Sequence, residues 1–187
     1  MGQYYHPTNL DKKQFLSSHD YGNGLKLMEH SYIGNGFLKV IEKLLTPMGE
    51  WFKNRIVWAG DYADPEPESL NGKPESKENR GENIYHIIGE VDSNKITPTE
   101  ELGKGFPYLI NHTLNVFIDL RKVKEFEKGW KIHPLPLLTC EGNGRGGGDF
   151  HGNDDRIGMW ARHSISLEKT KSKGYHEVDG TFLEENS

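Results

Sequence analysis

The clearest apolar pattern in the chain is that of one amphipathic helix. Apolar side chains recur three and four positions apart, which places them on a single helical face. They are Phe37, Leu38, Ile41, Leu44 and Leu45. Asn35 belongs to the residue types that cap helix starts, and Pro47 cannot continue a helix. The sequence therefore predicts one main amphipathic helix over about 35–45.

Other apolar runs are short and have the composition of β-strands. Residues 55–59 (RIVWA), 135–140 and 157–167 each read as a strand. Residues 5–15 and 108–117 share a further pattern: an aromatic segment reaches an asparagine, crosses polar residues and returns on an aromatic six positions later. This pattern is typical of a β-hairpin. The expected fold class is therefore α+β, with a mainly antiparallel sheet built from hairpins.

Between these strands the composition changes twice. Residues 64–82 are rich in Pro, Glu, Lys, Asn and Gly, which indicates a mobile acidic surface loop with almost nothing to bury. The segment 83–103 follows, with isoleucines at helical spacing and the capping-box pattern Thr97-Pro-Thr-Glu100, and it predicts short helices. The parts on either side of the loop are too small to fold alone, so we expect a single domain over 1–187.

Composition narrows the classes of function. The net charge of −5 argues against binding of duplex nucleic acid, which needs a broad excess of Lys and Arg. Cys140 is the single cysteine, so an intramolecular disulfide is excluded, as suits a reducing compartment. The sequence has no charged-then-apolar leader and no apolar run near the ~20 residues of a membrane helix. We therefore expect a cytoplasmic protein with no membrane partner.

The most unusual stretch is residues 140–155, CEGNGRGGGDFHGNDD. It matches the glycine spacing of a dinucleotide site, but no helix is predicted after it, and no Gly-Lys-Ser/Thr closes it as a P-loop. Successive glycine N–H groups can still form a concave nest for an anion, and arginines add donors for phosphate oxygens. The residues expected at the phosphates of a ligand are Gly144, Arg145, Gly146, Gly147 and Arg156. Trp58 or Trp160 could stack on a base. The alternative is a wide hairpin turn whose glycines only avoid strain.

Acidic residues near the same stretch support a second hypothesis. Asp61 follows a predicted buried strand, and Asp64 lies three residues later. Asp149 and His151 lie in residues 140–155, which we call the glycine segment. Such side chains can hold Mg²⁺, Mn²⁺ or Zn²⁺, which would activate water against a phosphate ester. No spacing here is diagnostic, and loop capping is the alternative for the carboxylates. The binding hypothesis needs no cofactor, whereas this catalytic one needs a divalent cation.

Five sequence blocks together resemble a family of small bacterial and phage proteins. The blocks are MGQYY, LKLMEHS, WAGDYAD, EGNGRGGGDF and GMWAR, and they span most of the chain. The resemblance brings no particular activity with it. For a phage protein it implies a role against host defence, such as sequestration of a signalling nucleotide in the host cytoplasm.

Three classes of function follow from the sequence. The one we favour is a small-molecule binding protein that recognises a phosphorylated nucleotide-like ligand. The alternatives are a metal-dependent phosphoesterase and a protein–protein inhibitor whose acidic loop at 64–82 binds a basic partner. Antiparallel sheet edges could also support a homo-oligomer.

Overall fold

The computed structural model describes residues 3–66, 82–143 and 147–184. Within these residues an eight-stranded sheet has the order β2-β1-β3-β7-β4-β5-β8, with β6 beside β3. The strands are β1 Tyr5–Asn9, β2 Gln14–Phe15, β3 Arg55–Gly60, β4 Tyr108–Asn111, β5 Val116–Asp119, β6 Cys140–Glu141, β7 His163–Glu168 and β8 His176–Glu177. The pairs β3–β6 and β5–β8 are parallel, and the other pairs are antiparallel. The predicted α+β class with a mainly antiparallel sheet is confirmed.

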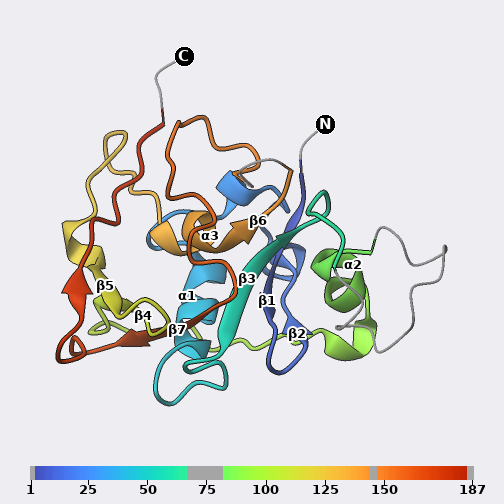
Figure 1. Cartoon of the computed structure of the whole chain (residues 1–187), viewed down its shortest axis with the longest axis horizontal. Coiled ribbons are helices and arrows are strands. Elements are labelled where there is room, and N and C mark those ends of the chain that lie inside the picture. The colour runs from blue at the N-terminus through green and yellow to red at the C-terminus, as the bar shows by residue number, and fades with distance from the viewer. Residues whose placement is uncertain (1–2, 67–81, 144–146, 185–187) are drawn as a thin grey trace.

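Helices lie against both faces of this sheet. The α-helices are α1 Gly36–Leu44, α2 Ile84–Gly89 and α3 Pro134–Thr139, and the 3-10 helices are η1 Ser18–Tyr21, η2 Leu27–Glu29, η4 Asp92–Asn94 and η5 Leu120–Lys122. Successive side chains of a strand point to opposite faces. Along β3, Ile56 and Trp58 join the main core with α1 and α3, whereas Val57 and Ala59 join a smaller cluster with α2. Figure 1 accordingly shows α2 on the far side of β1 and β2 from α1 and α3.

Helix α1 confirms the amphipathic pattern. The Asn35 side chain accepts a hydrogen bond from the Leu38 N–H at 3.2 Å, as expected of an N-cap. The apolar face is buried through Phe37, Leu38, Val40, Ile41 and Leu44. This face packs into the main core and fixes the position of the helix on the sheet.

Both predicted hairpins are present, and they are built alike. Asn9 Oδ1 accepts hydrogen bonds from the N–H groups of residues 11 and 12, and Asn111 Oδ1 accepts them from residues 113 and 114, each at 3.0 Å. Each turn then passes through one residue with positive φ, Lys13 (52°) or Asn115 (57°). The shared asparagine therefore marks a shared turn, in which its side chain replaces a backbone acceptor.

The prediction of a strand at 135–140 is wrong, because helix α3 occupies most of that range. His133 caps this helix by accepting a hydrogen bond from the Leu135 N–H at 3.1 Å, and Pro134 opens its first turn. A proline is tolerated there because the N–H it lacks has no partner inside the helix. All six residues of α3 are buried, so the segment has no polar face from which a helical period could be read.

Two other predictions need smaller corrections. Of the strand predicted at 157–167, only the part from His163 onward is extended, because Gly158 (φ 73°) and Arg162 (φ 65°) turn the chain before it. The capping-box pattern at residues 97–100 starts no helix. The short helices of this region are α2 and η4, which both precede it.

Candidate functional site

The glycine segment leaves the sheet beside the centre of the molecule. β6 pairs with β3 at Trp58 and Ala59, and β7 pairs with the same strand at Arg55 and Ile56. The segment between β6 and β7 therefore begins and ends on one side of β3. Three of its predicted phosphate ligands, Gly144, Arg145 and Gly146, lie outside the described residues. Gly147 is described, and its carbonyl accepts a hydrogen bond from the Phe150 N–H at 3.0 Å in a tight turn.

Two glycines of this segment pack against a buried tyrosine. A Cβ atom on Gly142 would lie 2.5 Å from Tyr5 Oη, and one on Gly148 would lie 2.8 Å from the Tyr5 ring. Burial, with smaller contributions from the nearby negative charges of Asp149 and Asp61, raises the pKa of Tyr5. These two glycines therefore have a packing role, which favours the turn interpretation for their part of the segment.

Arg162 links the glycine segment to the start of the predicted acidic loop at 64–82. Arg162 donates to both Glu141 carboxylate oxygens at 2.6 Å and to Glu66 Oε2 at 2.9 Å. The Glu66 side chain is almost fully buried, and the Glu66 N–H donates to the Glu82 carbonyl at 3.0 Å. The predicted loop at 64–82 thus starts and ends beside the first residues of the glycine segment. Its residues 67–81 lie outside the described part of the chain.

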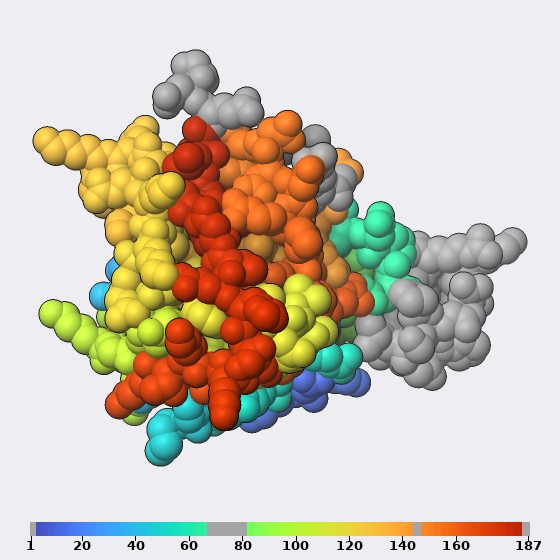
Figure 2. Space-filling view, turned by 60° about the vertical axis from the view of Figure 1, so that its left-hand side comes forward, coloured from blue at the N-terminus to red at the C-terminus, as the bar shows by residue number. Residues whose placement is uncertain are grey.

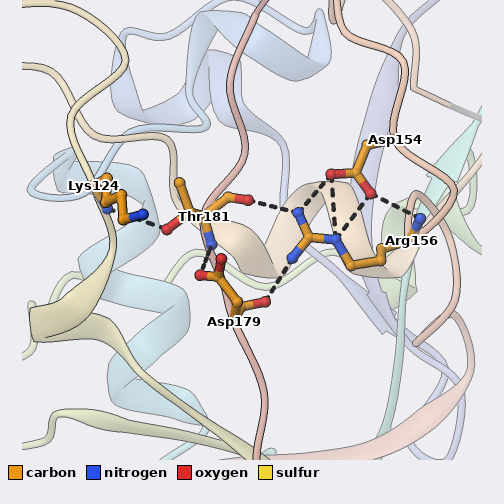
Figure 3. A network of polar contacts seen from close by, with 5 residues as sticks. All are labelled: Lys124, Asp154, Arg156, Asp179 and Thr181. Atoms are coloured by element: carbon orange, nitrogen blue, oxygen red, sulfur yellow. Dashed lines mark hydrogen bonds and ion pairs between the residues drawn. The ribbon is translucent and has the colours of Figure 1, made fainter.

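Arg156, a predicted phosphate ligand, is committed to other partners (Figure 3). Its Nε and Nη2 bind the Asp154 carboxylate, and two further N–H groups donate to the carbonyls of Asp179 and Thr181, each at 2.6 Å. Four of the five guanidinium N–H groups are thereby used. The guanidinium also lies 4.5 Å from the centre of the buried Phe182 ring. Arg156 therefore fixes the C-terminal segment, residues 178–184, on the molecule, and its predicted place among the residues at the phosphates is corrected.

The two tryptophans proposed for base stacking have different environments. Trp58 is fully buried in the main core, and its indole N–H donates to His30 Nε2 at 3.1 Å. It offers no face to a ligand, so this part of the prediction is corrected: a tryptophan inside a central strand belongs to the core. Trp160 lies instead at the wall of a surface groove.

The carboxylates of the metal hypothesis are spread over separate loops. Asp61 Oδ1 accepts from the Tyr4 N–H at 3.1 Å, and Asp149 Oδ1 accepts from the Met28 N–H at 2.9 Å. Asp64 and His151 are exposed. Among the described residues, no three His, Cys, Asp or Glu side chains come close enough to hold a metal ion. The two bonded carboxylates act here as acceptors for backbone N–H groups.

An apolar groove lies between the second hairpin, α3 and the C-terminal segment. Its volume is about 270 Å³, and we call it the Trp160 groove. It is lined by Leu114, Val116, Ile118, Leu138, Arg156, Met159, Trp160, Val178 and Asp179. Figure 2 shows how the C-terminal segment, in red, lies between residues of the yellow and orange parts of the chain on this side of the molecule. Two predicted site residues, Arg156 and Trp160, therefore meet here.

The rim of the Trp160 groove is apolar and exposed, which sequence reasoning missed. Leu114 is 45% exposed and Met159 is 54% exposed, and Val178 adds a third exposed apolar side chain. Contiguous exposed apolar side chains around a hollow are typical of binding surfaces. The available signal was one isolated apolar residue, Leu114, in the polar turn HTLN.

The charges beside the groove do not favour an anion. The bonds from Arg156 lower the pKa of Asp154, and the Thr181 N–H lowers the pKa of Asp179. Both carboxylates are therefore ionised at neutral pH, and they balance the charges of Arg156 and of nearby Lys124. A phosphate placed in the groove itself would thus meet no uncompensated positive charge.

No protein-family model, no curated protein and no solved structure matches this chain. None of the helices in the described ranges is long and apolar enough to cross a membrane.

Proposed function

We propose that this protein binds a nucleotide-like small molecule and that the base of the ligand lies in the Trp160 groove. The observation that carries the proposal is an open apolar hollow with a tryptophan in its wall and exposed apolar side chains at its rim. Its volume of about 270 Å³ is just below the ~300–1,000 Å³ typical of ligand pockets. That volume suits one ring system rather than a whole dinucleotide.

The phosphates of such a ligand belong outside the groove. The carboxylates that already balance the charge of Arg156 disfavour them there, so we assign them to the glycine segment, where Arg145 remains the proposed donor. Arg156 then shapes the groove by binding the carbonyls of Asp179, which lines the groove, and of Thr181. In a phage protein acting in the cytoplasm, such capture would withdraw a host defence nucleotide.

A capture experiment tests this proposal. The purified protein is incubated with a panel of linear, cyclic and ADP-ribose-type nucleotides with Mg²⁺ and Mn²⁺, separated from the solvent and heated, and the released species are identified by mass spectrometry. We expect one intact nucleotide from the protein fraction. A nucleotide converted in the solvent fraction, with loss of conversion in EDTA, would instead establish the metal-dependent phosphoesterase.

Two matched substitutions locate the captured molecule. Met159→Asp places a charge at the groove rim, whereas Met48→Asp places the same charge at a methionine that is 86% exposed and does not line the groove. Capture should fall by at least about tenfold in the first variant and stay unchanged in the second. Equal capture by both variants would place the ligand elsewhere.

A further inference from the structure

The strand order of the sheet is symmetric about its centre. Strands β2-β1-β3 mirror strands β5-β4-β7, and the two sets meet where β3 pairs with β7. Asn9 lies opposite Ile56 in one set, and Asn111 lies opposite Ile165 in the other. The two hairpins with equal turns thus occupy equivalent places, one on each side of the centre.

The connections to the central strands are equivalent as well. The Trp51 N–H donates to the Leu44 carbonyl of α1 at 2.9 Å, and the Trp160 N–H donates to the Leu138 carbonyl of α3 at 2.6 Å. Two residues after each tryptophan, a basic residue with positive φ donates its N–H to the opposite central strand. These bonds are Lys53 to the Ile165 carbonyl (3.0 Å) and Arg162 to the Ile56 carbonyl (2.8 Å). The pattern Gly-x-Trp-x-Lys/Arg-x-x-Ile occurs at 49–56 and again at 158–165.

A further segment completes each unit outside its hairpin. The Ile96 N–H donates to the Phe15 carbonyl at 3.0 Å, and the Val178 N–H donates to the Phe117 carbonyl at 2.9 Å. We therefore define an N-terminal unit, residues 5–60 with 95–96, and a C-terminal unit, residues 108–168 with 176–178. Each contains a hairpin, a helix, a tryptophan turn and a central strand. The two units are copies of one structural plan.

This equivalence gives the Trp160 groove a counterpart in the same molecule, and the counterpart is polar. In the N-terminal unit the Trp51 indole N–H donates to Gln14 Oε1 at 2.9 Å, and Lys12 pairs with Glu50 at 3.9 Å. The residues at the matching positions of the C-terminal unit are Val116 for Gln14, Leu114 for Lys12 and Met159 for Glu50. The fold accepts polar side chains at these positions, so folding alone does not require the apolar set.

Because Val116 stands where the N-terminal unit has Gln14, Trp160 also lacks the acceptor that Trp51 has. Trp160 is only 4% exposed, and no described residue accepts a hydrogen bond from its indole N–H, because Val116 has no acceptor to offer. Nε1 does not count among the described buried polar atoms that lack a partner, so this N–H is open to solvent. A ligand in the groove can therefore reach the N–H and accept a hydrogen bond from it.

We infer that the C-terminal unit has diverged from its copy into a site for an uncharged, flat heteroaromatic ring that accepts a hydrogen bond from Trp160. The inference rests on the proposed function and specifies its ligand. The apolar walls contact the faces of the ring, a ring nitrogen or carbonyl accepts from Nε1, and the neighbouring carboxylates select against an anionic ring. The N-terminal unit is the closed form of the same position, with Gln14 in the place of the ligand acceptor.

The test measures purine binding, because purine is such a ring without sugar or phosphate. Methyl NMR should show that purine shifts the signals of Val116 and Val178. The signals of Leu16 and Ile96, which lie in the corresponding part of the N-terminal unit, should not change. Val116→Gln supplies the acceptor found in the other unit and should weaken purine binding by at least about tenfold. The reciprocal control, Gln14→Val, should leave the affinity within about twofold even though it destabilises the fold.

The outcomes separate this inference from the proposed function. Purine binding at the groove with no nucleotide recovered in the capture experiment would contradict the nucleotide proposal and support the ring site. Unmoved Val116 and Val178 signals, or equal purine affinity of Val116→Gln and the wild type, would overturn the inference. If Val116→Gln does not fold, Leu114→Lys with Met159→Glu transfers the ion pair of the N-terminal unit instead, and the same loss of purine binding is expected.

Discussion

Arg156 allows a sharp test of how the C-terminal segment is held. The chain contains the same local motif twice: in Asp119-x-Arg121 and in Asp154-x-Arg156, the arginine binds the aspartate two residues earlier through its backbone N–H, Nε and Nη2. Arg156 differs because it also donates to the carbonyls of residues 179 and 181. Substituting each arginine by lysine keeps the charge but removes the fork of donors.

The expected effect of Arg156→Lys follows from the bonds that only Arg156 makes. A hydrogen bond contributes about 0.5–1.5 kcal/mol net, so loss of the two bonds to backbone carbonyls should lower the free energy of unfolding by about 1–3 kcal/mol. The Asp154 pair adds little, because the Arg156 side chain is about one-third exposed and its ion pair is screened by solvent. Arg121→Lys should be the milder change, because the described partners of its guanidinium are Asp119 and the Tyr108 hydroxyl, and none belongs to the described C-terminal segment.

Urea denaturation of both variants measures the difference. We expect a clearly lower midpoint for Arg156→Lys, together with faster amide hydrogen exchange in residues 179–183, and no such local change for Arg121→Lys. Equal midpoints and equal exchange in the two variants would refute the account of Arg156 as the residue that holds this segment.

Two further predictions concern packing and pH. Gly148→Ala and Gly174→Ala both place a side chain at positive φ, but only the side chain added at Gly148 meets the Tyr5 ring. Gly148→Ala should therefore lower the free energy of unfolding by about 1–3 kcal/mol more than Gly174→Ala. Equal losses of stability in thermal melts would contradict the packing role of Gly148. Burial lowers the pKa values of His6 and His30 to about 4, below their ordinary value of about 6.5, so the unfolded chain binds more protons between these values. The free energy of unfolding should therefore fall as the pH drops from about 6.5 to about 4, and urea midpoints that do not change over this range would contradict it.

The parts of the fold that carry a local signal could be predicted from the sequence. Helix α1 has a periodic apolar face and a capping asparagine, and both hairpins share an asparagine whose side chain builds the turn. Helix α3 could not be read in this way, because its six residues are all buried and show no period. The repeat of the whole unit was hidden by unequal spacing: Asn9 corresponds to Asn111, an offset of 102 residues, whereas Ile56 corresponds to Ile165, an offset of 109.

The candidate site was predictable only in part, because tertiary structure assembles it. Arg156 and Trp160 were identified from their place beside the glycine segment, and both line the groove. The sequence also places Trp58 at the ligand because it lies on a strand next to candidate site residues, but that strand is central in the sheet and its tryptophan is buried. Leu114 lies in the turn between β4 and β5, and Val178 follows β8. Both come beside Trp160 only through tertiary structure, because β4 pairs with β7 and β8 pairs with β5.

The most direct measurement of the central claim is the indole N–H signal of Trp160 in ¹H–¹⁵N spectra, recorded with and without the nucleotide recovered by capture. The account predicts a downfield shift of the Trp160 proton at saturation, since the base supplies an acceptor, while the Trp51 signal stays in place because Gln14 already accepts from it. An unchanged Trp160 signal with saturating nucleotide would show that the base does not lie in the Trp160 groove.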